Sequence, residues 1–289
     1  MPPPRRYVSG VDSSSANREG RMNTLSGRYV LLTGGSRGIG PVIADALARR
    51  GAHLALAARS ADGLRDTCDA LRSYGIRTLA VPVDLADATE RQRLAERVLN
   101  EFDRIDVLVS NAAVENEGAF VQTPWPAVDQ TIEVNLAAPI HLTHLLLPHM
   151  LRQGHGHVVH VSSIGGKLGV PYDAVYCGTK AALGEWSRGL RLELAQTGIH
   201  VSTILPGYVV GVGMFARFGM PPPWLMGSCT PAQVATAVVR AIEAPCPEVI
   251  VNSRPMRPVF ALAQLFPRLG DWIIRRSGVA EFQRKKVGG

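Results

Sequence analysis

Short apolar runs alternate with longer amphipathic segments along most of the chain. The apolar runs are rich in Val, Leu, Ile and Ala and lie at 29–32, 53–57, 78–81, 107–109, 157–161, 200–204 and 249–251. Segments with helical spacing begin at Gly40, Ala61 and Ala88, and others lie near 129–153, 174–197 and 231–244. Continuous apolar strands separated by helices are typical of a parallel sheet that is covered on both faces. The pattern predicts an α/β fold: a Rossmann-like, doubly wound parallel sheet in a single domain.

The two ends of the chain depart from this alternation. Residues 1–27 are rich in Pro, Ser, Arg and Gly without periodicity, which predicts a disordered leader before a domain at 28–251. Residues 252–289 mix large apolar with basic side chains and predict a helical, amphipathic extension. Such a helix docks on its own domain or on a sister subunit, or makes a peripheral contact with an anionic membrane. Both interpretations stay open.

The charge distribution narrows the classes of function. The net charge is +7, but five arginines lie in 1–28 and eight Lys/Arg lie in 252–289, so the body between them is mildly acidic. A basic groove for nucleic acid is therefore not expected. No apolar run approaches the ~20 residues that span a bilayer, and no signal core precedes the domain, which favours a cytoplasmic protein. The four cysteines lack CxxC spacing, so we expect free thiols and no metal site.

A glycine-rich loop directly follows the first apolar run. It reads Thr33-Gly34-Gly35-Ser36-Arg37-Gly38-Ile39-Gly40 and opens the first helix. Glycines allow a tight turn and a close backbone approach, so that a pyrophosphate can lie at the helix N-terminus. A glycine turn without a ligand is the alternative. The position between strand and helix favours a dinucleotide site.

The end of the second strand indicates which dinucleotide binds. The segment Leu56-Ala57-Ala58-Arg59-Ser60 lacks the carboxylate that would hold the ribose hydroxyls of NAD. Arg59, flanked by Arg37, is placed to bind a 2′-phosphate, which favours NADP(H); a merely solvated Arg59 is the alternative. After the third strand, Asp84-Leu85 either meets the adenine edge, or Asp84 caps the helix that starts near Ala88.

A tyrosine and a lysine provide the candidate acid–base chemistry. Tyr176 and Lys180 are four residues apart and so share one helical face. A free phenol has a pKa of about 10, and a neighbouring cation is expected to lower the pKa of Tyr176 towards neutrality. Ser163 ends the preceding strand segment and can orient a substrate oxygen.

Taken together, these residues resemble the short-chain dehydrogenase/reductase family over Gly27–Val251. The matching signatures include Asn111-Ala112-Ala113 after the fourth strand, Asn135, and Pro206-Gly207 followed by Val209. The resemblance implies an oxidoreductase that transfers hydride between NADP(H) and a carbonyl or alcohol of a small molecule. It implies a catalytic tetrad: Tyr176 as general acid/base, Lys180 at the nicotinamide ribose, Asn135 at a water relay and Ser163 at the substrate. The implied cofactor-binding residues are Gly34, Ser36, Arg37, Gly38, Ile39, Gly40, Arg59, Asp84, Leu85, Asn111, Ala112, Tyr176, Lys180, Pro206, Gly207 and Val209.

Two departures and a variable segment refine this expectation. Ala113 replaces the usual glycine, and Gly211 stands where many members carry a threonine against the nicotinamide carboxamide. The segment Val212–Ser228, which forms a lid in the family, is rich in Met, Phe, Pro and Trp and favours a lipophilic substrate; simple core packing is the alternative. A homodimer or homotetramer is expected. The competing functions are a catalytically silent NADP-binding regulator or scaffold, and an epimerase or dehydratase that also uses the Tyr–Lys spacing.

Overall fold

The computed structural model describes residues 25–215, 219–223 and 226–288, with side chains up to Lys285. The expected disordered leader at 1–24 lies outside the described residues. Residues 25–27, which composition assigned to the leader, contact the domain. Leu25 is buried in the core, and the backbone N–H of Gly27 donates to the Gly51 carbonyl at 2.9 Å. The buried side chain and this hydrogen bond connect residues 25–27 to the domain.

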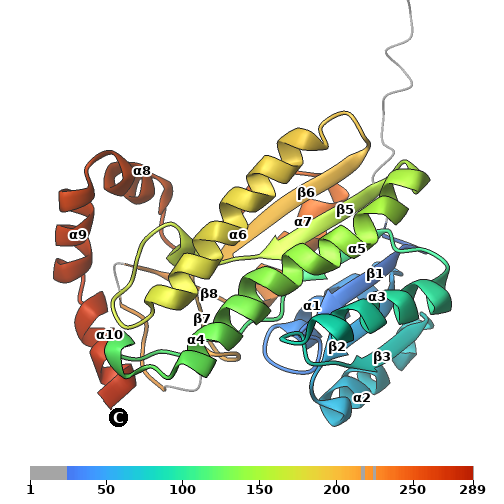
Figure 1. Ribbon diagram of the computed structural model, residues 1–289, viewed down its shortest axis with the longest axis horizontal. Helices are drawn as coiled ribbons and strands as arrows, with labels where there is room; N and C mark the ends of the chain where they lie inside the picture. The colour runs from blue at the N-terminus through green and yellow to red at the C-terminus, as the bar shows by residue number, and fades with distance from the viewer. Residues whose placement is uncertain (1–24, 216–218, 224–225, 289) are drawn as a thin grey trace, which may run out of the picture.

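Seven parallel strands form the central sheet, in the order β3-β2-β1-β4-β5-β6-β9 (Figure 1). They are β1 (Tyr29–Thr33), β2 (His53–Ala58), β3 (Thr78–Pro82), β4 (Val107–Ser110), β5 (Gly156–Val161), β6 (Ile199–Pro206) and β9 (Glu248–Val251). Every residue of β4 and β5 is buried, as a sheet covered on both faces requires. The strand order reverses between β1 and β4, where doubly wound sheets bind ligands. The predicted fold class is confirmed.

Helices cover both faces of the sheet. One face is packed by α1 (Gly40–Ala48), α2 (Ala61–Ala70) and α7 (Pro231–Glu243), whose apolar side chains join one core cluster. The other face is packed by α3 (Ala88–Phe102), α5 (Ala138–Gln153) and α6 (Ala174–Glu193), which lie in front of the sheet in Figure 1.

The segment expected as one helix over 129–153 is more complex. It begins earlier, as α4 (Trp125–Ile132), because Pro124 and Pro126 favour a helix start there. A π-helical turn at Glu133–Ala137 then leads into α5. Such turns are rare and often occur at functional sites. The sequence also gave no signal for the two-stranded pair β7 (Tyr208–Val209) and β8 (Ser228–Cys229).

The C-terminal extension forms three helices, α8 (Arg257–Leu265), α9 (Pro267–Arg276) and α10 (Val279–Gly288). Phe260, Ile274 and Val279 are buried in a small cluster with Ile164 and Leu205 of the domain. The extension therefore docks on its own domain, beside the carboxyl ends of the strands. No helix among the described residues is long and apolar enough to cross a membrane.

Candidate active site

A cavity of about 800 Å³ opens at the carboxyl ends of β1, β4, β5 and β6. Parallel strands direct the loops after them to this one edge of the sheet, so residues distant in sequence meet there. The predicted site residues that line it are Gly34, Ser36, Arg37, Gly38, Ile39, Arg59, Asp84, Leu85, Asn111, Ala112, Ser163, Tyr176, Lys180, Pro206, Gly207 and Val209. Two predicted residues, Gly40 and Asn135, lie outside the lining and support it from behind.

The glycine loop is shaped by contacts that exclude side chains. Gly34 and Gly38 have positive φ values of 73° and 66°. A Cβ on Gly40 would lie 1.9 Å from the carbonyl oxygen of Gly34, so the first helical turn can approach the loop only because Gly40 has no side chain. The Asn111 amide holds the same loop by donating to the Thr33 carbonyl at 3.0 Å. The Oδ1 atom of Asn111 is buried without a hydrogen-bond partner among the described residues, which leaves an acceptor free at the cavity. This cradle fits a dinucleotide.

The surroundings of the second strand are basic. Arg59 follows β2 directly, Arg37 lies in the glycine loop, and both exposed side chains line the cavity. The first carboxylate after the strand, Asp62, belongs to α2 and pairs with Arg65. Between Leu56 and Ser60 the strand end thus offers the cavity a guanidinium group and no carboxylate.

Asp84 does not cap the next helix. The N-cap of α3 is Asp87, whose carboxylate accepts from the backbone N–H groups of Thr89 and Glu90. Asp84 instead accepts from the Ala86 N–H at 3.0 Å and lines the cavity beside Leu85. The alternative that Asp84 caps α3 is wrong, because the turn Asp84–Asp87 places the carboxylate of Asp87 at the start of this helix.

Tyr176 lies in a pocket that favours its protonated form. Burial, followed by the carboxylates of Glu115 and Asp173, raises the pKa of the Tyr176 phenol well above its usual value. A hydrogen bond with Ser163 lowers the pKa of Tyr176 but offsets only part of this rise. The expected lowering of this pKa by Lys180 is not observed, and the pKa is shifted in the opposite direction. The Ser163 hydroxyl also accepts from the Gly165 N–H at 3.0 Å, which fixes its position at the end of β5.

Lys180 is buried beneath Tyr176 on the same face of α6. Its Nζ atom lies 5.6 Å from the centre of the Tyr176 ring and donates to the Val161 carbonyl at 3.0 Å. Burial lowers the pKa of Lys180 to about 8, although Glu115 acts in the opposite direction. The lysine thus joins the end of β5 to the cavity floor.

Asn135 is fully buried in the π-helical turn and holds the loop after β4. Its Oδ1 accepts from the Val114 N–H at 2.8 Å, and its Nδ2 donates to the Val114 carbonyl at 2.8 Å. A longer bond of 3.3 Å joins Nδ2 to Thr179 of α6. The side chain therefore ties three elements of the site together.

The sequence reasoning missed Glu115 and Glu117, which lie with Asp173 in a group of carboxylates beside Tyr176. Ligand oxygens of Glu115, Glu117 and Asp173 lie within 4.8 Å of one another. Glu115 and Asp173 line the cavity. Their positions after β4 and before α6 were a usable signal, because both segments end at the carboxyl edge of the sheet. Lys167, the nearby cation, turns away and pairs with Glu248 at 2.7 Å.

The outer wall of the cavity comes from the lid and the extension. Met214, Phe215 and Met226 of the lid line it, as does Gln283 of α10. The ring centres of Tyr208 and Phe282 lie 5.7 Å apart, and that of Phe215 is 5.8 Å from Phe282. Phe218, Trp224 and Leu225 of the lid lie outside the described residues. Gly211 does not line the cavity, in keeping with the loss of the threonine contact.

Comparisons with known proteins agree with this geometry. The sequence profile of the family described as short chain dehydrogenase matches residues 28–219. The ketoacyl reductase HetN of Nostoc sp. is 38% identical over 92% of this chain and 94% of its own length. The L-rhamnose 1-dehydrogenase (NAD(P)(+)) of Sphingomonas sp. is 35% identical over 65% of this chain and 75% of its own.

Solved structures show the same fold. A metagenomic short-chain oxidoreductase in complex with NADP superposes with a TM-score of 0.70 at 30% identity. The match covers 80% of this chain and 100% of that one.

Proposed function

Since the chain belongs to the short-chain dehydrogenase family, we propose that it interconverts a carbonyl and an alcohol on a lipophilic small molecule with NADP(H) as cofactor. One observation carries the proposal: the Tyr176 phenol, the glycine loop and Arg59 line the same cavity. A proton donor, a pyrophosphate cradle and a 2′-phosphate contact thus converge on one site.

Each residue of the tetrad has a physical role in this proposal. The bound nicotinamide supplies the hydride. Tyr176, held protonated by its burial, donates its proton to the carbonyl oxygen, while the Ser163 hydroxyl holds the same oxygen in place. Lys180 supports the phenol from below, and Asn135 fixes the loop after β4.

Apolar side chains support a lipophilic substrate. Much of the lining beyond Tyr176 consists of Ile164, Leu168, Val170, Met214, Phe215 and Met226. Ketoacyl compounds are the first class to test, because the name of the Nostoc relative states that it reduces them. The family resemblance further supports a homodimer or homotetramer in the cytoplasm, and sedimentation velocity measures the assembly.

The test is Tyr176→Phe, which removes only the phenolic hydroxyl. We expect it to abolish NADPH-dependent reduction of β-ketoacyl esters while NADPH affinity stays close to that of the wild type. Tyr172→Phe is the matched control, since Tyr172 precedes the same helix and does not line the cavity. Substantial turnover by Tyr176→Phe would refute the proposed proton transfer. NADPH binding without turnover of a broad ketone and alcohol panel by the wild type would favour the silent regulator.

A further inference from the structure

Large apolar side chains are exposed along the outer side of the extension. The five are Leu262, Leu265, Phe266, Leu269 and Trp272, here called the α8–α9 face. Leu265 is 73% exposed, Phe266 57% and Trp272 55%. Contiguous exposed apolar side chains of this size usually mark a surface that meets a partner or a membrane.

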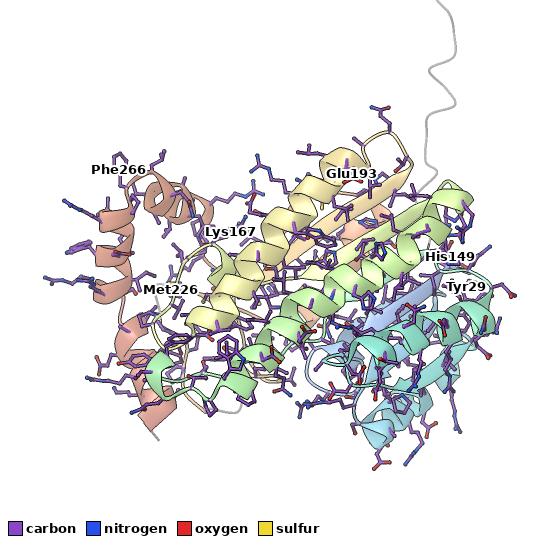
Figure 2. All side chains as sticks on the ribbon, viewed as in Figure 1. Tyr29, His149, Lys167, Glu193, Met226 and Phe266 are labelled. Atoms are coloured by element: carbon purple, nitrogen blue, oxygen red, sulfur yellow. The ribbon has the colours of Figure 1, made fainter. Side chains whose placement is uncertain are left out.

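Packing on the inner side fixes which side of the two helices faces outward. Ile274 and Phe260 are buried against the domain. A Cβ on Gly270 would lie 2.8 Å from the Cβ of Ala263, so the helices touch closely at this glycine. Figure 2 shows Phe266 at the outer end of this arm. The exposed face is therefore a consequence of the fold and protrudes from the molecule.

The charges around the face are mainly positive. Residues 252–276 contain five arginines and a single carboxylate, Asp271. Arg257, Arg268, Arg275 and Arg276 are all exposed. The guanidinium carbon of Arg276 lies 5.8 Å from the ring centre of Trp272, so charge and aromatic surface occupy one patch.

We propose that the α8–α9 face docks on the surface of an anionic lipid bilayer. Arginines complement lipid phosphates, and the leucines and aromatic rings enter the boundary between headgroups and acyl chains. A second copy of the chain fits less well, because a two-fold contact would bring the same arginines against one another. The arm formed by α8 and α9 protrudes, and a flat surface such as a bilayer can contact it more readily than a groove on another protein can.

Other exposed apolar residues lie at the same end of the molecule. Phe120, Val121 and Trp125 are 64%, 92% and 68% exposed. They follow Glu117, which contacts Gln283 of α10, so this segment lies beside the extension, as Figure 1 shows for α4 and α10. The cavity wall formed by α10 thus adjoins the lipid-facing end, where a lipophilic substrate would enter.

Vesicle flotation of the full-length protein tests this docking. We expect binding to phosphatidylcholine vesicles that contain phosphatidylserine, weak binding to phosphatidylcholine alone, and weakening by salt. Removing one arginine reduces binding about fivefold near an anionic surface, so Arg268→Gln with Arg275→Gln and Arg276→Gln should weaken it on the order of a hundredfold. Leu265→Ser with Phe266→Ser should remove the binding that survives high salt.

Matched controls lie at other places on the surface. Leu192→Ser removes a leucine that is 69% exposed on α6, and Arg65→Gln with Arg72→Gln removes exposed charge near α2. Both should bind vesicles like the wild type. The proposal is overturned if the wild type does not float with anionic vesicles, or if both α8–α9 variants float unchanged. It is also overturned if these variants only dissociate a dimer in solution, which would identify a second copy as the occupant.

A second, independent observation concerns Gln283 of α10. Its side chain is 3% exposed and lines the cavity that contains Tyr176. Its Nε2 donates a long hydrogen bond of 3.5 Å to the Glu117 carboxylate. Because a carboxylate only accepts, this contact fixes the orientation of the amide. Oε1 is then buried with no hydrogen-bond partner among the described residues.

We infer that Oε1 of Gln283 accepts a hydrogen bond from a hydroxyl or amide N–H group of the substrate. An unpartnered buried acceptor is costly, so a ligand that supplies the missing donor gains affinity over one that does not. The inference rests on the proposed reductase function and adds to it a preference for substrates with a donor group away from the reacting carbonyl. Gln283 would be a specificity residue that the extension contributes.

The test compares β-ketoacyl esters of increasing chain length, each with and without a terminal hydroxyl. At the chain length that reaches α10, the wild type should prefer the hydroxylated ester by roughly two- to tenfold in kcat/KM, the size of one hydrogen bond. Gln283→Leu should lose this preference, mainly through KM. Glu117→Gln frees the amide to rotate and should reduce the preference while Gln283 stays in place. Gln264→Leu, on the exposed side of α8, is the matched control.

The outcomes separate the two proposals. No turnover of any ester by the wild type contradicts the proposed substrate class. Turnover without a hydroxyl preference, or a preference that Gln283→Leu retains, overturns the role of Gln283 and leaves the reductase function standing. Thermal melting of Gln283→Leu shows whether α10 stays folded; a preference that persists in a folded variant is decisive against the inference.

Discussion

Cofactor preference depends on two guanidinium groups that the structure brings to one edge of the cavity. Arg59 follows β2 and Arg37 lies in the glycine loop, and both line the cavity. The change to make is Arg59→Ile together with Ala58→Asp. It removes a cation and places a carboxylate at the end of the second strand. This carboxylate can accept a hydrogen bond from a ribose hydroxyl, whereas it repels a 2′-phosphate.

The magnitude follows from the exposure of these side chains. A hydrogen bond to a charged group contributes about 1.5–3 kcal/mol, and an exposed guanidinium is screened towards the lower end. Arg59→Ile alone should therefore weaken NADPH binding about tenfold, since 1.4 kcal/mol is a factor of ten. Arg59→Ile with Arg37→Ala should weaken it on the order of a hundredfold. NADH lacks the phosphate, so its affinity should change little in either variant.

Fluorescence titration of NADPH and NADH against each protein measures both affinities. Arg65→Ile is the matched control, because Arg65 is on α2, pairs with Asp62 and does not line the cavity. Equal wild-type affinity for the two cofactors would refute the reasoning. A loss of NADH binding as large as that of NADPH would show that Arg59 supports the loop and does not read the phosphate.

The remaining predictions concern protonation and the glycine loop. Burial lowers the pKa of His157 and of His160 to about 3 in the folded protein, whereas a histidine of the unfolded chain has a pKa of about 6.5. Below about pH 6.5 the unfolded chain therefore binds more protons than the folded protein, and the free energy of unfolding falls as pH falls. Denaturant unfolding should show a loss of about 2 kcal/mol per histidine between about pH 7.5 and about pH 5, and His157→Gln with His160→Phe should flatten the slope. Gly40→Ala should abolish NADPH binding by titration while circular dichroism stays native-like, because its Cβ would meet the Gly34 carbonyl; normal affinity would contradict this. The raised pKa of Tyr176 predicts that the rate of carbonyl reduction is flat between about pH 6 and about pH 8, whereas alcohol oxidation rises with pH; stopped-flow rates that fall together would contradict it.

The strands and most helices could be predicted because all strands of the sheet are covered on both faces and share one residue pattern. A strand buried on both faces must be apolar throughout, and the runs at 107–109 and 157–161 follow that rule closely. The π-helical turn at Glu133–Ala137 could not be predicted, because its residues continue the helical spacing on either side. The burial of Leu25 could not be predicted for a related reason. A composition averaged over 1–27 hides a single apolar side chain that packs in the core.

The site was predictable where chain order alone sets the geometry. Loops after parallel strands meet at one edge, so the glycine loop, Asn111, Ser163 and Pro206 had to converge. Gln283 could not be placed in this way, because it reaches the cavity through the docking of α10 and not through the sheet. The carboxylates of Glu115 and Asp173 were predictable only in part. Their place at strand and helix ends was visible, but their effect on Tyr176 depends on distances that the sequence does not give.

Tyr176 shows why spacing and electrostatics have to be argued separately. Its distance of four residues from Lys180 correctly places both groups on one face of α6, and the lysine lies beneath the ring. The same spacing suggested a lowered phenol pKa, but burial and two carboxylates raise it. Lys180 also donates to the Val161 carbonyl and is itself destabilised as a cation by burial. A protonated phenol needs no base before it donates to a carbonyl oxygen, whereas alcohol oxidation must first remove that proton. Burial and the carboxylates of Glu115 and Asp173 therefore set the protonation state of Tyr176 more strongly than its spacing from Lys180 does.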